Sequence, residues 1–89
     1  MSLESFEAER GPAWRRLREA LDRARGRPER LGPDGVRELG SLYRAAAADL
    51  AYARRRFPGD PVVGRLEALV VAATRRAIRA RKSAFTRRA

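Results

Sequence analysis

The side chains that could perform covalent chemistry in this chain are few, and they lack the partners that such chemistry needs. The sequence contains no histidine and no cysteine, so the commonest general base, the commonest zinc ligand and the thiolate are all missing. A hydroxyl nucleophile needs a neighbouring base to take its proton. The residues that carry hydroxyls on aliphatic side chains are Ser2, Ser5, Ser41, Thr74, Ser83 and Thr86. We therefore expect no enzymatic activity, no cofactor or metal site and no small-molecule substrate.

The carboxylates and the glycine-rich turn do not change this expectation. Glu19 and Asp22 are interleaved with arginines, an arrangement that favours salt bridging over proton transfer. Arg15, Glu19 and Arg23 are spaced four residues apart, which is typical of a solvent-exposed helix face with ion pairs along it. The Gly-Pro-Asp-Gly turn at residues 32–35 lacks the spacing and the lysine of a phosphate-binding loop.

The chemistry that the sequence does offer is positive charge, concentrated toward the C-terminus. The formal net charge is +10, and no acidic residue follows Glu67. Seven cations without an acid exceed what the dipole of a helix C-terminus requires. They predict contact with an anionic membrane surface or an acidic protein partner. The cations of this basic tail, residues 75–89, are Arg75, Arg76, Arg79, Arg81, Lys82, Arg87 and Arg88.

The elements that position this tail are predicted to be three helices, at about 3–25, 33–57 and 61–87. Apolar residues recur three and four positions apart throughout, and alternation typical of strands is absent. We expect an all-α fold, an antiparallel three-helix bundle that forms a single domain over residues 1–89. The last helix would be nearly 40 Å long at ~1.5 Å per residue, so its basic end should project from the bundle.

Helix boundaries follow from capping signals. Ser2 is a predicted N-cap, and Asp60 with Pro61 should begin the third helix. Pro12 predicts a kink in the first helix, because proline removes one backbone hydrogen bond. With Gly32 as N-cap, Leu31 and Val36 would form a hydrophobic staple.

The apolar stripes identify the expected core. The second helix carries a seam that packs lengthwise and could serve one chain or two, so a homodimer stays open. Tyr43, Tyr52 and Phe57 are interpreted as core residues rather than as a platform for stacking bases. The first helix contributes Leu3, Phe6, Trp14, Leu17, Leu21 and Ala24; the second contributes Val36, Leu39, Tyr43, Ala46, Leu50, Ala53 and Phe57; the third contributes Val62, Leu66, Leu69, Val70, Ala73 and Ala77.

Nucleic-acid binding is the alternative to an anchoring module, because basic helical domains of high isoelectric point have its electrostatic signature. The arginines are not interleaved with side chains that read bases, so binding would be independent of sequence.

No apolar run reaches the roughly 20 residues needed to cross a bilayer, and the acidic N-terminus does not match a signal peptide. The expected location of these residues is the cytoplasm.

Several motifs resemble the N-terminal part of the stage II sporulation protein M family of membrane proteins. The resemblance covers nearly the whole chain. It rests on Leu3-x-x-Phe6, Pro12-x-Trp14-x-x-Leu17, Leu31-x-Pro33, Glu38-Leu39-x-x-Leu42-Tyr43-Arg44, Asp49-Leu50 and Leu66-x-x-Leu69-Val70-x-x-Ala73.

The resemblance implies a cytoplasmic helical region that precedes several transmembrane helices. Sporulating members of that family belong to a complex that remodels the cell envelope. Three positions depart from the family pattern: Gly32 replaces a Ser or Thr cap, Gly35 an acidic residue and Thr74 a common histidine. The resemblance therefore implies a non-catalytic domain at the cytoplasmic face of the inner membrane, acting through interaction or anchoring.

Overall fold

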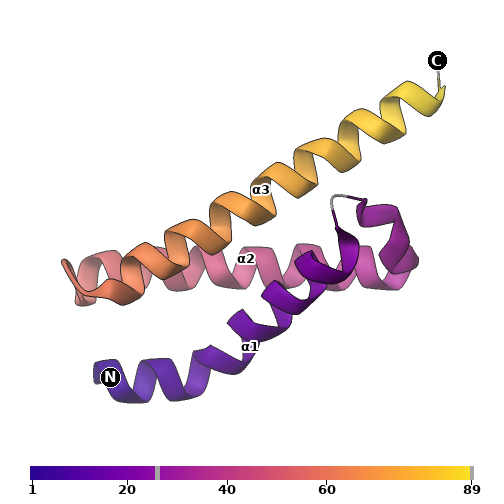
Figure 1. Cartoon of the computed structure of the whole chain (residues 1–89). Coiled ribbons are helices and arrows are strands. Elements are labelled where there is room, and N and C mark those ends of the chain that lie inside the picture. The colour runs from indigo at the N-terminus through magenta and orange to yellow at the C-terminus, as the bar shows by residue number, and fades with distance from the viewer. Residues whose placement is uncertain (26, 89) are drawn as a thin grey trace.

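The computed structural model shows an all-α chain built as a three-helix bundle (Figure 1). It describes the backbone of residues 1–25 and 27–88, and the side chains of residues 1–25, 27 and 29–76. Over these residues the elements are α1 (Leu3–Ala24), a 3-10 helix η1 (Pro28–Leu31), α2 (Gly32–Arg56) and α3 (Pro61–Arg88). The three helices predicted from the sequence are confirmed, each to within a residue at either end.

Helix α1 begins where the sequence places its cap. The Ser2 hydroxyl accepts a hydrogen bond from the Ser5 backbone N–H at 3.1 Å, which satisfies one of the free donors of the first turn. Pro12 lies inside the helix, and α1 bends part way along its length in Figure 1. The predicted kink is confirmed, and the stripe resumes in phase beyond it, with Leu17, Leu21 and Ala24 all buried.

The start of α2 differs from the predicted staple. Val36 is 40% exposed, whereas Leu31 packs against the core. Leu31 lies against Gly35 instead, since a Cβ built at Gly35 would be 2.7 Å from the Leu31 Cβ. The assignment of Val36 to the seam is wrong, because its side chain faces solvent.

The connection between α2 and α3 is short and capped as predicted. The Asp60 Oδ1 accepts a hydrogen bond from the Val62 N–H at 2.9 Å, and Pro61 occupies the first position of α3. Gly59 adopts a positive φ of 83°, which reverses the chain within a few residues. The turn makes α2 and α3 antiparallel neighbours (Figure 1).

The core consists of two adjoining clusters along the bundle. Phe6 joins the aromatic group at one end, with its ring centroid 5.2 Å from that of Tyr52 and 5.6 Å from that of Phe57. Tyr43 packs on the other cluster. The interpretation of these aromatics as core residues is confirmed. The buried members are Phe6, Leu50, Ala53, Val62 and Leu66 in one cluster and Leu17, Ala20, Leu21, Leu39, Ala46, Leu69 and Ala73 in the other.

Helix α3 is the longest helix that the structure describes. Its 28 residues span about 42 Å at 1.5 Å per residue. Figure 1 shows its C-terminal half rising away from α2 on the side where α1 ends. Ala77 was predicted to belong to the apolar stripe of this helix, and its side chain lies outside the described residues.

Candidate functional site

The predicted basic tail begins on α3 beside the end of α1. Arg75 is exposed and Arg76 is half-buried. The Arg76 Nη1 donates a hydrogen bond to the backbone carbonyl of Leu21 at 3.4 Å. For the other five predicted contact residues, Arg79, Arg81, Lys82, Arg87 and Arg88, the helical backbone is described but the side chains lie outside the described residues.

Arg76 therefore joins the tail to the C-terminus of α1. The same Leu21 carbonyl accepts the Arg25 backbone N–H at 3.2 Å, so one oxygen receives two donors. A cation near the last carbonyls of a helix also complements the negative end of its dipole. The contact places α3 beside the loop that follows α1. The charges counted along the sequence did not reveal that these two segments are neighbours.

That loop supplies further cations. Arg23, Arg25, Arg27 and Arg30 are exposed and lie between the last turn of α1 and the end of η1. Asp22 and Glu29 are the acidic residues of the same stretch. We call the six arginines Arg23, Arg25, Arg27, Arg30, Arg75 and Arg76 the basic end of the bundle.

Arg25 occupies a backbone conformation that arginine seldom adopts. Its φ of 45° and ψ of 45° place it in the left-handed region, where glycine or asparagine usually ends a helix. It is the one residue other than glycine with a positive φ in the described part of the chain. The fold thus carries a strained cation at the centre of the basic end.

Three other arginines are matched with acids of a neighbouring helix. Arg10 Nε lies 2.9 Å from Asp49 Oδ2 between α1 and α2. Arg54 Nη2 lies 3.1 Å from Glu67 Oε1 between α2 and α3, and Arg65 Nη2 lies 2.9 Å from Glu7 Oε1 between α3 and α1. Among the described side chains, each pair of helices is thus joined by one ion pair.

None of these ion pairs includes an arginine of the basic end, and Glu29 in the same stretch is itself engaged in an interaction. Arg16, Arg44 and Arg55, elsewhere on the surface, are likewise absent from these pairs. What distinguishes the basic end is therefore that six arginines gather around the end of α1.

The ion pairs expected along the α1 surface differ from those that the structure describes. Arg15, Glu19 and Arg23 are exposed, as the spacing predicts. None of the four ion pairs among the described side chains joins them to one another. Three of those four pairs connect different helices instead. The carboxylate with most partners is Asp49, which accepts from the Arg10 Nε and from the Trp14 indole Nε1 at 2.8 Å.

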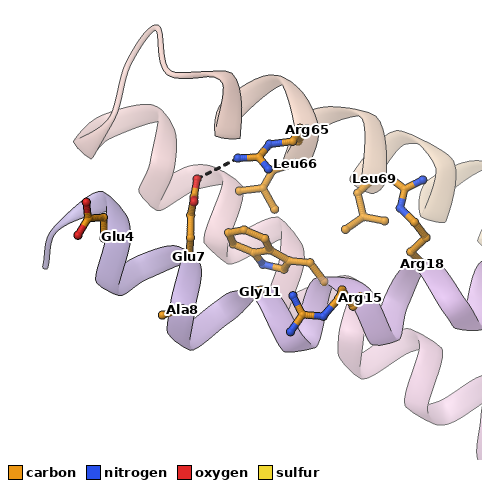
Figure 2. A pocket seen from close by; sticks show the side chains of 10 residues that line it. Glu4, Glu7, Ala8, Gly11, Arg15, Arg18, Arg65, Leu66 and Leu69 are labelled. Atoms are coloured by element: carbon orange, nitrogen blue, oxygen red, sulfur yellow. Dashed lines mark hydrogen bonds and ion pairs between the residues drawn. The ribbon is translucent and has the colours of Figure 1, made fainter.

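A second feature is a groove between α1 and α3, with a volume of about 560 Å³. Figure 2 shows Glu4, Glu7, Gly11, Arg15 and Arg18 following one another along α1, with α3 on the opposite wall. The apolar lining comes from Trp14, Leu66 and Leu69. Sequence reasoning did not identify this groove, because its walls come from helices about 50 residues apart.

No helix within the described residues is long and apolar enough to cross a membrane. No group of three or more acidic, histidine or cysteine side chains within them could hold a metal ion.

Comparison with known proteins gives one match. A family model described as a domain of unknown function (DUF8413) matches residues 4–79. No curated protein and no solved structure matches the chain.

Proposed function

The chain belongs to the DUF8413 family, and we propose that it is a non-catalytic helical module of a membrane protein, which contacts anionic lipid headgroups through its basic end. The first part of the basic tail on α3 belongs to this surface. In this proposal the module lies at the cytoplasmic face of the membrane and the helices serve as a rigid carrier for the arginines.

The gathering of six arginines at one end of the bundle supports the proposal most directly. Arg10, Arg54 and Arg65 are neutralised by Asp49, Glu67 and Glu7, so they contribute little to an external field. None of these pairs includes an arginine of the basic end, and five of its six arginines are exposed. Guanidinium groups bind phosphate oxygens well because they offer a planar set of donors.

The Arg76 contact gives the arrangement its geometry. By holding α3 against the carbonyl of Leu21, it keeps the loop arginines and the start of the tail on one side of the molecule. Cations near an anionic leaflet contribute roughly 1 kcal/mol each. Six arginines presented together would therefore bind far more strongly than the same charges spread over the surface.

The resemblance of the helix-packing motifs to the N-terminal part of the stage II sporulation protein M family supports the membrane-protein context. In such a protein, cations beside the first membrane segment would also orient it.

Co-sedimentation with vesicles tests the proposal. The 89-residue chain should bind vesicles that contain phosphatidylglycerol and should not bind vesicles of phosphatidylcholine alone. Replacing Arg75, Arg76, Arg79 and Lys82 with glutamine should weaken binding to the anionic vesicles by up to about 10³-fold, since four contacts of roughly 1 kcal/mol are removed.

A control of equal charge separates a localised surface from net charge alone. Arg16, Arg44, Arg55 and Arg56 are exposed and form no ion pair among the described residues, and replacing them with glutamine removes the same four charges. This variant should keep most of the binding. Equal losses in the two variants, or equal binding to neutral vesicles, would contradict the proposal. Tight binding to duplex DNA at 150 mM salt without vesicle binding would support the nucleic-acid alternative instead.

A further inference from the structure

The groove between α1 and α3 has an arrangement of charge that the proposed function does not use. Glu4 lies at one end of its α1 wall and Arg18 at the other. Both side chains are exposed, and neither forms an ion pair or a hydrogen bond among the described residues. Arg15 is likewise exposed and unpaired, whereas Glu7 already contacts Arg65. The wall is thus acidic toward the N-terminus of α1 and basic toward its middle.

The residues of this wall are symmetric about Gly11. Glu4 and Arg18 are each seven positions from Gly11, and Glu7 and Arg15 are each four positions from it. Ala8 and Trp14 are each three positions from it. All of these residues line the one groove, so they share one face of α1.

Such a face is complementary to itself in an antiparallel arrangement. A second α1 that crosses at Gly11 with reversed direction would set Glu4 opposite Arg18 of the partner subunit and Glu7 opposite Arg15 of the partner subunit. A two-fold axis repeats every contact, because residue i meets j while j meets i. Trp14 would cover Ala8 of the partner subunit at each side of the axis.

We infer that this face of α1 is a homodimer interface, in which a second copy of the chain lies antiparallel across the groove with the two-fold axis at Gly11. The inference concerns a different surface from the basic end and does not depend on membrane binding. It also differs from the α2 seam considered from the sequence, because Leu39, Ala46 and Leu50 of that seam are buried within one chain.

Gly11 makes the close approach feasible. It is buried, and a Cβ added there would meet only the tip of Arg15, at 3.4 Å from its Nη1. Because Arg15 lies over Gly11 in the single chain, the Arg15 side chain must turn toward the partner subunit before two helices can touch at this position. Since a long side chain at position 11 fits the single chain once Arg15 moves, its main effect should fall on the dimer.

The charges should set both the affinity and its response to salt. Exposed ion pairs each contribute a fraction of a kcal/mol and are screened at physiological ionic strength. The dimer should therefore be weak and should dissociate as salt rises. Arg18→Glu places like charges opposite one another twice per dimer and should weaken association by about tenfold or more. Glu4→Arg should do the same.

Sedimentation equilibrium over a concentration series at low salt tests the inference with compensating changes. The two single variants should be monomers when alone, and an equimolar mixture should form a heterodimer. The double variant Glu4→Arg with Arg18→Glu should regain the affinity of the parent chain. Gly11→Leu should dissociate while retaining its helical circular dichroism.

Cysteine cross-linking fixes the geometry, since the chain contains no cysteine of its own. A Gly11→Cys chain should form a disulfide-linked dimer under mild oxidation, because the two copies meet at this position. In a Glu4→Cys chain the two sulfur atoms would be about 21 Å apart along the axis, so cross-linking should be slow. A parent chain that stays monomeric at millimolar concentration and low salt would overturn the inference. So would a double variant that fails to recover, or cross-linking that is as fast at position 4 as at position 11.

Discussion

Replacing Asp49 with asparagine should destabilise the bundle more than any other single change of an exposed or half-buried polar residue in the described part. The Asp49 carboxylate is 14% exposed and accepts three hydrogen bonds from α1. Two come from the Arg10 Nε at 2.9 and 3.1 Å, and one comes from the Trp14 indole N–H at 2.8 Å. Asparagine has similar size and helix propensity but offers one acceptor oxygen and no charge.

The expected loss is about 2 kcal/mol of unfolding free energy. A hydrogen bond to a charged group contributes roughly 1.5–3 kcal/mol. The Arg10 side chain is 35% exposed, so hydrogen bonds to water replace part of the free energy that Arg10 loses. The indole N–H is left with a weaker acceptor. Because small domains have about 5–15 kcal/mol in total, this one substitution removes a sizeable fraction of the stability.

Urea denaturation followed by circular dichroism measures the effect. With a slope of about 1 kcal/mol per molar, in the range for small domains, the midpoint should fall by roughly 2 M. Glu67→Gln serves as the matched control, because it breaks an ion pair whose side chains are 56% and 47% exposed. That pair should contribute less than about 1 kcal/mol.

A double-mutant cycle identifies the cause. Trp14→Phe removes the indole N–H while keeping an aromatic ring, and its cost should be smaller when Asp49 is already asparagine. A coupling free energy of about 1 kcal/mol or more is expected. Additive effects, or an Asp49→Asn chain within 0.5 kcal/mol of the parent, would refute the reasoning.

Two other substitutions test the backbone. Arg25→Gly should raise the unfolding free energy by about 1 kcal/mol, because glycine adopts the left-handed conformation without strain. The same change should weaken binding to anionic vesicles, because it removes a cation. A lower melting temperature would contradict the first expectation. Gly35→Ala should lower the melting temperature although alanine favours helix by up to about 1 kcal/mol, because its Cβ would lie 2.7 Å from that of Leu31; a stabilised variant would show that this contact relaxes easily.

The sequence was sufficient where the determining interactions are local. Ser2 and Asp60 cap their helices as their types predict, and the buried positions of α1 and α3 follow the periodic stripes. Each of these features depends on residues within one or two helical turns. The fold class could therefore be predicted without knowledge of the tertiary contacts.

The interactions between helices could not be predicted in the same way. Asp49 lies 35 and 39 positions from its partners Trp14 and Arg10, and periodicity gives no information on which exposed residues meet across helices. Val36 matched the periodic seam equally well, yet it is 40% exposed, because no neighbouring helix covers it.

The basic end was predicted only in part for the same reason. Charge counting along the chain identified Arg75 and Arg76. It missed the loop arginines, because residues 1–38 are nearly neutral in total. The sequence does show four arginines within residues 23–30, next to the predicted end of the first helix. That the third helix lies beside these arginines is known only from the contact between Arg76 and Leu21.

The orientation of the chain on a vesicle shows whether the basic end faces the membrane. A fluorophore attached to a single cysteine at Asp34, beside the basic end, can be compared with one attached at Ser5, at the far end of the bundle; both positions are exposed. With phosphatidylglycerol vesicles that carry a quencher on the headgroup, the account predicts strong quenching at position 34 and little at position 5. Equal quenching at both positions, or stronger quenching at position 5, would contradict it.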